Sequence, residues 1–247
     1  MVTIGEIKVV TLNNLYVNLE SKDTRDYFTG MMLMRTRGWS PEYPENYLPF
    51  DASDFVGRHH LFCVERDGRF LPFAGFRQVP LEICDFYKIK EAHLGLVEKA
   101  NSSPHVEALN SLFNECRKNK TTLISGSKVT ISSAFRGNKQ LSEHVRELIA
   151  ALLVLDSQEG TQTIQLGSGV FRFKTDQFLD RMGFKPLTLG NTELPPVQIP
   201  EAGSEPILIM TNHEYSDWAK SCVEKHCEEL NRRVILDEMP AVGKIAA

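Results

Sequence analysis

Hydrophobic and polar positions change their spacing several times along the chain, and each spacing predicts an element. Alternating or β-branched apolar residues predict strands over residues 7–12, 60–65, 70–79, 128–135, 161–166, 184–189 and 206–210. Apolar residues three and four positions apart predict helices over residues 21–35, from residue 103, after residue 142, and over residues 175–182 and 214–230. Strands and helices therefore alternate along much of the chain.

Local turn and capping signals set the order of these elements. Asp67-Gly68 between two of the strands predicts a tight hairpin, and Ser103-Pro104 is typical of a helix start. A mixture of hairpin and strand–helix–strand units favours one α/β domain over the whole chain, 1–247, with a core of about 25–211. The proline-rich stretch 191–205 is interpreted as a hairpin-like excursion, and residues 38–50 as a long ordered loop.

Composition and charge exclude several classes of protein. The 247 residues carry a formal net charge of -4 and no basic run, which argues against a nucleic-acid partner. The longest apolar block, 148–155, is too short to span a membrane, and the first residues do not resemble a secretory signal. The five cysteines form no CxxC pair, and we attribute the spacing of Cys222, His226 and Cys227 to packing. We therefore expect a cytoplasmic protein without a metal.

The stretch SSAFRGNKQLSEH, residues 132–144, predicts a strand that turns directly into a helix. The first N–H groups of a helix are unpaired, and with the helix dipole they can hold a phosphate. Arg136 and Lys139 add positive charge, Gly137 permits a close approach or a positive φ, and Ser142 is a candidate N-cap. From the turn alone, an ordinary β–α connection with solvated basic residues remains the alternative.

Two further groups of motifs give this turn a context. FLDRMGFKPL, residues 178–187, predicts a short helix that ends at Gly183 and leads into a strand. With the Arg-Gly turn, it resembles the GNAT-type N-acyltransferase superfamily. RGW at 37–39, FDASDF at 50–55 and FRQVP at 76–80 are similar to the autoinducer synthase and long-chain N-acyl amino acid synthase branch. The resemblance covers about 25–211 and implies a mixed, splayed central β-sheet flanked by helices.

The resemblance also implies an activity. Members of this branch move an acyl group from a phosphopantetheine thioester, on an acyl carrier protein or coenzyme A, to an amine. We therefore expect transfer of a fatty acyl group to an amino acid or a similar small acceptor, with an acyl carrier protein as a possible partner. Leu179 lies where many acetyltransferases carry a tyrosine. An ordinary acetyl-CoA-dependent acetyltransferase and a non-catalytic thioester-binding module stay open as alternatives.

The resemblance and the chemistry of amide formation together select candidate site residues. The phosphate turn comprises Phe135, Arg136, Gly137, Asn138, Lys139, Gln140 and Leu141. Backbone N–H groups near Ser132, Ser133 and Ala134 are expected to stabilise the oxyanion, with Ser133 as the central donor. The candidates for the general base are Asp51, Asp54 and Glu65.

The acceptor side is expected around Trp39 and Arg77. The two aspartates Asp51 and Asp54 could instead order the tryptophan loop by pairing with Arg77. An arginine in the apolar strand around Arg77 needs a carboxylate partner, from the protein or from the substrate. His59-His60 is interpreted as strand edge rather than as a base. A basic docking surface for an acidic carrier protein would involve Arg136, Lys139 and Arg172.

Overall fold

The fold is built around one mixed β-sheet. The computed structural model describes residues 6–39, 42–43, 50–66, 68–158, 163–199 and 205–236. The strands of the large sheet are β1 (Ile7–Asn13), β2 (Arg58–Arg66), β3 (Arg69–Pro80), β4 (Thr122–Ile131), β5 (Thr163–Val170), β6 (Lys185–Pro186), β9 (Val197–Ile199), β10 (Glu205–Asn212) and β11 (Val234–Leu236). Their order is β11-β1-β2-β3-β4-β5-β10-β6, with β9 paired to β10, and a small separate hairpin joins β7 (Thr188–Leu189) to β8 (Thr192–Glu193).

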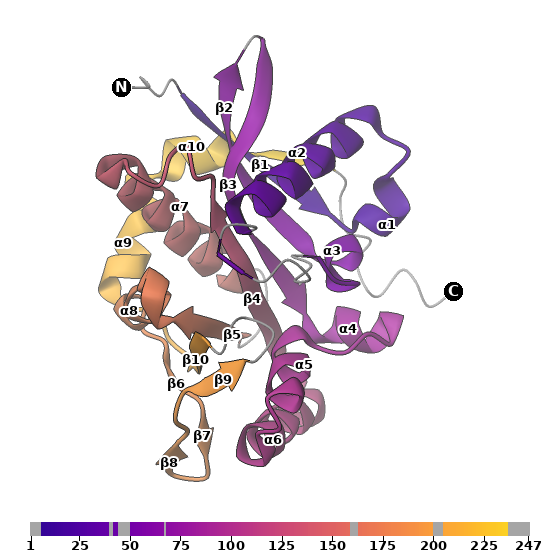
Figure 1. Cartoon of the computed structure of the whole chain (residues 1–247), viewed down its shortest axis with the longest axis vertical. Coiled ribbons are helices and arrows are strands. Elements are labelled where there is room, and N and C mark those ends of the chain that lie inside the picture. Colours follow the sequence, from indigo (N-terminus) through magenta and orange to yellow (C-terminus); the bar gives the residue numbers. More distant parts are fainter. Residues whose placement is uncertain are drawn as a thin grey trace.

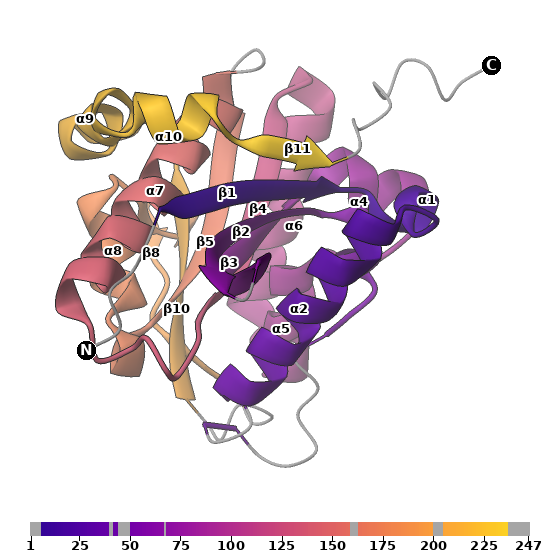
Figure 2. The ribbon, with the colours of Figure 1, turned by 90° about the horizontal axis from the view of Figure 1, so that it is seen from above.

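Helices cover both faces of the sheet (Figures 1 and 2). One face carries α7 (Lys139–Gln158), α8 (Thr175–Arg181), α9 (Asp217–Lys225) and α10 (Cys227–Asn231). The other face carries α1 (Leu15–Asn18), α2 (Lys22–Trp39), α3 (Ser53–Val56), α4 (Leu81–Tyr87), α5 (Ala92–Lys99) and α6 (Ser103–Asn119). A short 3₁₀ turn, Phe171–Phe173, follows β5.

Separate apolar clusters lie on the two faces. The predicted stripe of α7, including Val145, Leu148 and Leu152, packs with Phe62 and Phe76 of the central strands. On the opposite face, the predicted stripe of α6 packs against β4 and β5 through Leu109, Phe113, Leu123, Ile164 and Leu166. Since side chains alternate along a strand, this packing decides which residues of β4 and β5 face which layer of helices.

The predicted fold class is confirmed, and several boundaries are corrected. The strand predicted over 128–135 is β4, which starts at Thr122 and ends at Ile131. The last positions predicted as strand form turns instead, because Phe135 N–H donates to the carbonyl of Ser132. Helix α7 begins at Lys139, and the side chain of Asn138 accepts from Leu141 N–H at 3.0 Å. Asn138 therefore caps the helix, and Ser142, predicted as the cap, lies within it.

Other differences concern the ends of the chain and short helices. The predicted helix 214–230 is divided into α9 and α10 at His226. The helices α4 and α5 were not predicted from the sequence. The strands β1 and β11 belong to the main sheet although they lie outside the expected core of 25–211. Most of the predicted loop 38–50 lies outside the described residues, and α2 extends to Trp39 within it.

Candidate functional site

The parallel strands β4 and β5 separate partway along their length. They pair from Thr122↔Thr163 to Ser125↔Leu166. Beyond this point β4 continues to Ile131 and β5 to Val170, but the two strands no longer pair with each other. Lys128 has a φ of 59° and lies where the pairing of β3 with β4 shifts its register. A bulge of this kind bends the strand. The splayed strands expected from the sequence are therefore present, and the open backbone runs from residue 126 to 131.

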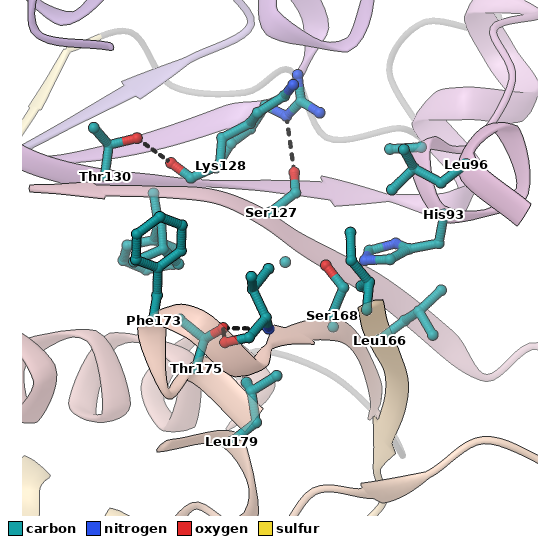
Figure 3. Close-up of a pocket in the computed structure, with 18 of the residues that line it drawn as sticks. His93, Leu96, Ser127, Lys128, Thr130, Leu166, Ser168, Phe173, Thr175 and Leu179 are labelled. Carbon is teal, nitrogen blue, oxygen red and sulfur yellow. Dashed lines mark hydrogen bonds between the residues drawn. The ribbon is translucent and has the colours of Figure 1, made fainter. Parts of the chain in front are cut away.

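A cavity of about 960 Å³ lies where the two strands separate (Figure 3). Its walls come from both faces of the sheet. On the α7 and α8 face they include Ile149, Leu153, Phe178, Leu179 and Phe184, and on the α2 and α5 face Trp39, Asp51, Arg77, His93 and Lys128. A cavity with walls on both faces passes through the gap between β4 and β5. It can hold two ligands that enter from opposite sides and meet at the gap.

The two halves of the cavity differ in chemistry. Its α7 and α8 side is lined mainly by aliphatic and aromatic side chains of the main apolar core. Gly167 of β5 faces this side, because an added Cβ there would lie 3.5 Å from Leu179 and 3.3 Å from Phe184. The α2 and α5 side is polar and charged. One half suits an apolar chain, and the other suits a small charged molecule.

A group of ions lies at the polar half, buried except for Asp51 and the partly buried Lys128, and we call it the cavity cluster: Arg35, Asp51, Asp54, Arg77 and Lys128. Arg77 donates to both carboxylate oxygens of Asp51 at 2.7 and 3.2 Å and lies 3.0 Å from Asp54. Arg35 lies 2.5 Å from the same oxygen of Asp54, Oδ1, that Arg77 approaches. The sequence left open whether Arg77 pairs with the protein or with a substrate, and the structure gives it protein partners.

The cluster contains one more positive than negative group. Burial disfavours the Asp54 carboxylate, but Arg77 and Arg35 overcome this effect and hold its pKa well below the usual range. Burial, together with Arg35, lowers the pKa of His59 to about 3, so this neighbour is neutral at physiological pH. Three cations then face two carboxylates, and two of these cations, Arg77 and Lys128, line the cavity.

Lys128 is held at the cavity wall by its backbone and its neighbours. Its Nζ lies 3.7 Å from Asp51 and 5.0 Å from the centre of the Trp39 ring. Trp39 is fixed in turn, because its indole N–H donates to Thr130 Oγ1 at 2.9 Å. Burial and the nearby Arg77 lower the pKa of Lys128 to about 8. Lys128 therefore presents a partly buried amino group to the cavity.

The predicted phosphate turn is tied to the chain around α2. Arg136 donates to the carbonyls of Gly38 at 2.6 Å and Ile131 at 2.9 Å, and it pairs with Glu42 at 2.9 Å. Arg172 also lies near Glu42, at 3.6 Å. The guanidinium of Arg136 therefore joins the end of α2 to the end of β4. The expected docking surface loses part of its charge to Glu42.

The remaining residues of the turn differ in exposure. Phe135 packs against Phe73, and Leu141 is buried in the core. Gly137, Lys139 and Gln140 are exposed, and an added Cβ on Gly137 would meet nothing within 4 Å. No other described part of the protein therefore lies close to Gly137, and its φ is not positive.

Four predicted catalytic or substrate residues lie away from the cavity walls. Glu65 is exposed near the end of the β2–β3 hairpin, opposite Phe70. Ser132, Ser133 and Ala134 lie in the turns after β4, where Ser132 N–H donates to Phe73 C=O at 2.7 Å. These three residues, predicted to supply the oxyanion donor, therefore follow the end of β4, and the backbone that is not paired with β5 precedes them.

Lys128, Glu91 and His93 were not singled out from the sequence. The sequence predicts a strand at Lys128 and no helix or strand over residues 91–93. The strand assignment gave no sign of the bulge that turns Lys128 to the cavity. A glutamate two positions before a histidine at a helix start is a weak signal, which gains meaning only when the helix faces a cavity.

A second group of polar side chains joins α7 to α9 and α10. The possible metal-ligating atoms of His144, His226 and Glu229 lie within 4.8 Å of one another. His226 is hydrogen-bonded to Glu229 at 2.8 Å and to Glu147 at 2.9 Å, and His144 to Glu229 at 3.0 Å. Each of these groups therefore has a protein partner, and Cys222 and Cys227 are not part of the group.

Comparison with known proteins places the fold. The AHL synthase LasI matches with a TM-score of 0.53 and 13% identity, over 95% of this chain and 98% of that chain. The chain has the fold of the acyl-homoserine lactone synthases. The CoA-dependent acyl-homoserine lactone synthase BjaI, with SAM and isopentyl-CoA, gives a TM-score of 0.50 at 13% identity, covering 98% of each chain. The predicted GNAT-like fold is thereby confirmed.

Sequence comparison adds no relative. No protein-family model matches the chain, and no curated protein matches it. Among the solved structures, FeeM, an N-acyl amino acid synthase from uncultured soil microbes, has a TM-score of 0.47 at 10% identity, over 85% of this chain and 93% of that chain.

Within the described residues, the structure contains no helix long and apolar enough to cross a membrane.

Proposed function

We propose that the protein is an N-acyltransferase that moves an acyl group from a phosphopantetheine thioester to the amine of a small carboxylate-bearing acceptor. The observation that carries this proposal is the cavity between β4 and β5, which has an apolar half on one face of the sheet and a charged half on the other. Amide formation needs two unlike substrates whose reacting atoms meet, and a cavity that passes through the sheet provides such a meeting point.

The apolar half is the proposed donor side. Leu179 lies at the position where many acetyltransferases carry a tyrosine, and it lines this wall with Phe178 and Phe184. A leucine offers no proton to a departing thiolate but adds apolar surface to an acyl chain. The size of the cavity, about 960 Å³, favours an acyl group longer than acetyl. We therefore prefer a medium- or long-chain donor to acetyl-CoA.

The open backbone of β4 is the proposed oxyanion site. Between residues 126 and 131 this strand lies along the cavity and is not paired with β5. A backbone N–H directed at the thioester carbonyl stabilises the negative charge that develops on its oxygen. This role needs no special side chain, which fits the absence of a Ser–His or Cys–His nucleophile pair among the described cavity walls.

The charged half is the proposed acceptor side. Arg77 and Arg35 contact Asp54 and Asp51, and Lys128 is a further cation that lines the cavity. An acceptor carboxylate can pair with Lys128 beside the Trp39 ring. We propose an amino acid or a similar amine carrying a carboxylate as acceptor. Asp51 and Asp54 then hold the cluster together and do not act as the base.

Donor binding can be measured as a shift in the thermal midpoint. Acetyl-CoA, a long-chain acyl-CoA and the same acyl group on phosphopantetheine are compared at equal concentrations. A ligand at 100 Kd that binds only the folded state adds about 2.7 kcal/mol of stability. Equal shifts with both long-chain forms support a carrier-protein donor, and a shift only with the CoA forms supports coenzyme A.

Catalysis is then measured as thiol release with a panel of amines with and without a carboxylate. Release that depends on a carboxylate-bearing amine supports the proposal. A thermal shift with acetyl-CoA alone supports the alternative function, an ordinary acetyl-CoA-dependent acetyltransferase. Binding of thioesters without thiol release from any amine identifies a non-catalytic binding module, and no shift with any thioester contradicts the proposed function.

A further inference from the structure

Glu91 and His93 form a buried pair at the start of α5. One oxygen of Glu91 accepts from Leu94 N–H at 2.8 Å and so caps the helix. The other oxygen lies 2.9 Å from His93 Nδ1. Both side chains are almost fully buried, at 4% and 1% exposure. Because the helix end fixes one carboxylate oxygen, the second is held in a constant position against the imidazole ring.

This contact sets the tautomer of the ring. Burial opposes the charge on Glu91, but His93 and the Leu94 N–H overcome this effect and lower the pKa of the carboxyl to about 2. An ionised carboxylate can only accept, so the proton between the two groups belongs on His93 Nδ1. The lone pair of a neutral ring is then on Nε2.

The Nε2 atom of His93 has no protein partner among the described residues, although it is buried. The ring is directed from α5 toward the cavity, whose wall it forms with Leu96 (Figure 3). An unpartnered buried polar atom carries a free-energy cost, which a ligand in the cavity would remove. The pair therefore presents a proton acceptor to the cavity.

The other buried histidines do not share this arrangement. His59 contacts Arg35 at 3.1 Å and the carbonyl of Asp54 at 2.7 Å, so both of its nitrogens are occupied. His60 contacts Thr11 and Gln78, and His226 contacts two glutamates. Within the described residues, His93 is the buried histidine with a nitrogen left unpaired.

We propose that His93, oriented by Glu91, is the general base that deprotonates the acceptor amine. The inference rests on the proposed N-acyltransferase function. His93 lies on the α2 and α5 side of the sheet, the same side as Lys128, which would hold the acceptor carboxylate. A base on this side reaches the amine of an acceptor that enters there, while the thioester enters from the opposite face.

The step balances without another reactant. His93 Nε2 takes one proton from the ammonium group and leaves a neutral amine. The amine nitrogen attacks the thioester carbonyl, so a C–N bond forms and the oxygen becomes an oxyanion. When this intermediate collapses, the C–S bond breaks and the second proton of the nitrogen passes to the leaving thiolate. The proton on His93 is then released to water.

The test compares two acceptors in the full-length protein. The variant His93→Gln keeps a polar side chain at the cavity, and His105→Gln is the matched control, because His105 is equally buried but lies on α6 bonded to Ser102. One acceptor is an amino acid whose amine is protonated at neutral pH. The other is a hydroxylamine that also carries a carboxylate, aminooxyacetate, which we call the hydroxylamine; its amine is largely unprotonated at neutral pH and does not need a base before attack.

We expect His93→Gln to lower kcat for the amino acid by about 10²–10⁴-fold, with a much smaller loss for the hydroxylamine, because general-base catalysis contributes on this scale. The thermal shift with the thioester donor should not change. Added imidazole should restore part of the amino-acid activity in His93→Ala. Glu91→Gln should show the same preference for the hydroxylamine with a smaller loss, which gives a second reading where His93→Gln does not fold.

The possible failures are distinguishable. Thiol release by the wild-type protein that His93→Gln leaves unchanged contradicts this inference and leaves the proposed function intact. Equal losses with both acceptors also contradict it, because they indicate a structural role for the ring. A wild-type protein that binds the donor but releases thiol with neither acceptor contradicts the proposed function, and the assignment of the base fails with it.

Discussion

Two buried groups of ions lie on opposite faces of the central strands, and they differ in what they leave open. The cavity cluster has three cations and two carboxylates, and its members Asp51, Arg77 and Lys128 line the cavity. The second group, which we call the back cluster, surrounds Asp156 of α7 with Arg58, His60 and Arg233, at 3.2, 3.0 and 3.6 Å. Among the described residues, no member of the back cluster lines the cavity.

The two clusters differ in whether their charged side chains face the cavity. In the back cluster, two arginines and a histidine converge on one carboxylate, and packing closes the site around them. In the cavity cluster, the two arginines are consumed by aspartates while a third cation faces the space for a ligand. A buried ion pair is weak evidence for stability, but the loss of one partner is strongly destabilising. Both clusters should therefore matter for folding, and only the cavity cluster should matter for acceptor binding.

The largest effect is expected from Arg77→Met in the cavity cluster. The change removes the guanidinium that contacts both Asp51 and Asp54, and it leaves the buried Asp54 with Arg35 as its remaining cationic partner in the cluster. We expect the free energy of unfolding to fall by about 3–5 kcal/mol. Urea unfolding measures it, and Arg77→Lys, which keeps the charge without the two-pronged contact, should lose less. A loss below about 1 kcal/mol would show that the two aspartates find other partners.

The back cluster should control stability toward acid. Burial opposes the charge on Asp156, but His60, Arg58 and Arg233 overcome this effect and lower its pKa from 3.8 to about 2. A lowered carboxyl pKa stabilises the folded state above pH 3.8, and this contribution is lost as the pH falls to about 2. The shift corresponds to about 2 kcal/mol.

Asp156→Asn should accordingly lose about 2 kcal/mol at neutral pH and show a weaker dependence of stability on pH below 4. Urea unfolding at several pH values measures both effects. The folded fraction of this variant should retain acyl transfer and acceptor affinity. A parallel loss of acceptor affinity would show that the two clusters are coupled through the sheet, and the contrast between them would then be wrong.

The smallest effect on stability is expected at Lys128, together with a selective effect on binding. Lys128→Met should leave the free energy of unfolding within about 1 kcal/mol. Affinity for a carboxylate analogue of the acceptor that lacks the amine should fall about tenfold or more, since a partly buried charge pair is lost. Equal weakening for an uncharged analogue would contradict the assignment.

The pH dependence of that affinity provides an independent check. The pKa of Lys128 is lowered to about 8, so the side chain loses its charge as the pH rises through this value. Binding of the carboxylate analogue to the wild-type protein should weaken between pH 7 and pH 9. Lys128→Arg should keep its affinity over this range, because the guanidinium stays protonated.

The periodic elements could be predicted because their signals are local. The stripe of α7, the start of α6 and the Asp67-Gly68 hairpin depend on residues close together in the chain. The resemblance also predicts the splayed strands. It places the open backbone near residues 132–134, whereas the part of β4 that is not paired with β5 is residues 126–131. The end of β4 depends on the pairing with β3 and on the bulge at Lys128, and neither appears in hydrophobic spacing.

The sequence by itself determined the α/β class, the strand–turn–helix unit at residues 128–155, and the need of Arg77 for a carboxylate partner, with Asp51 and Asp54 as candidates. These follow from side-chain periodicity and from the need of a buried arginine for carboxylates. Only the tertiary structure decided that Arg77 is already occupied, that Arg136 orders the chain after α2, and that Lys128 and His93 share a cavity. Pairing over long sequence separations and the divergence of β4 from β5 place these groups, and local spacing carries no record of either.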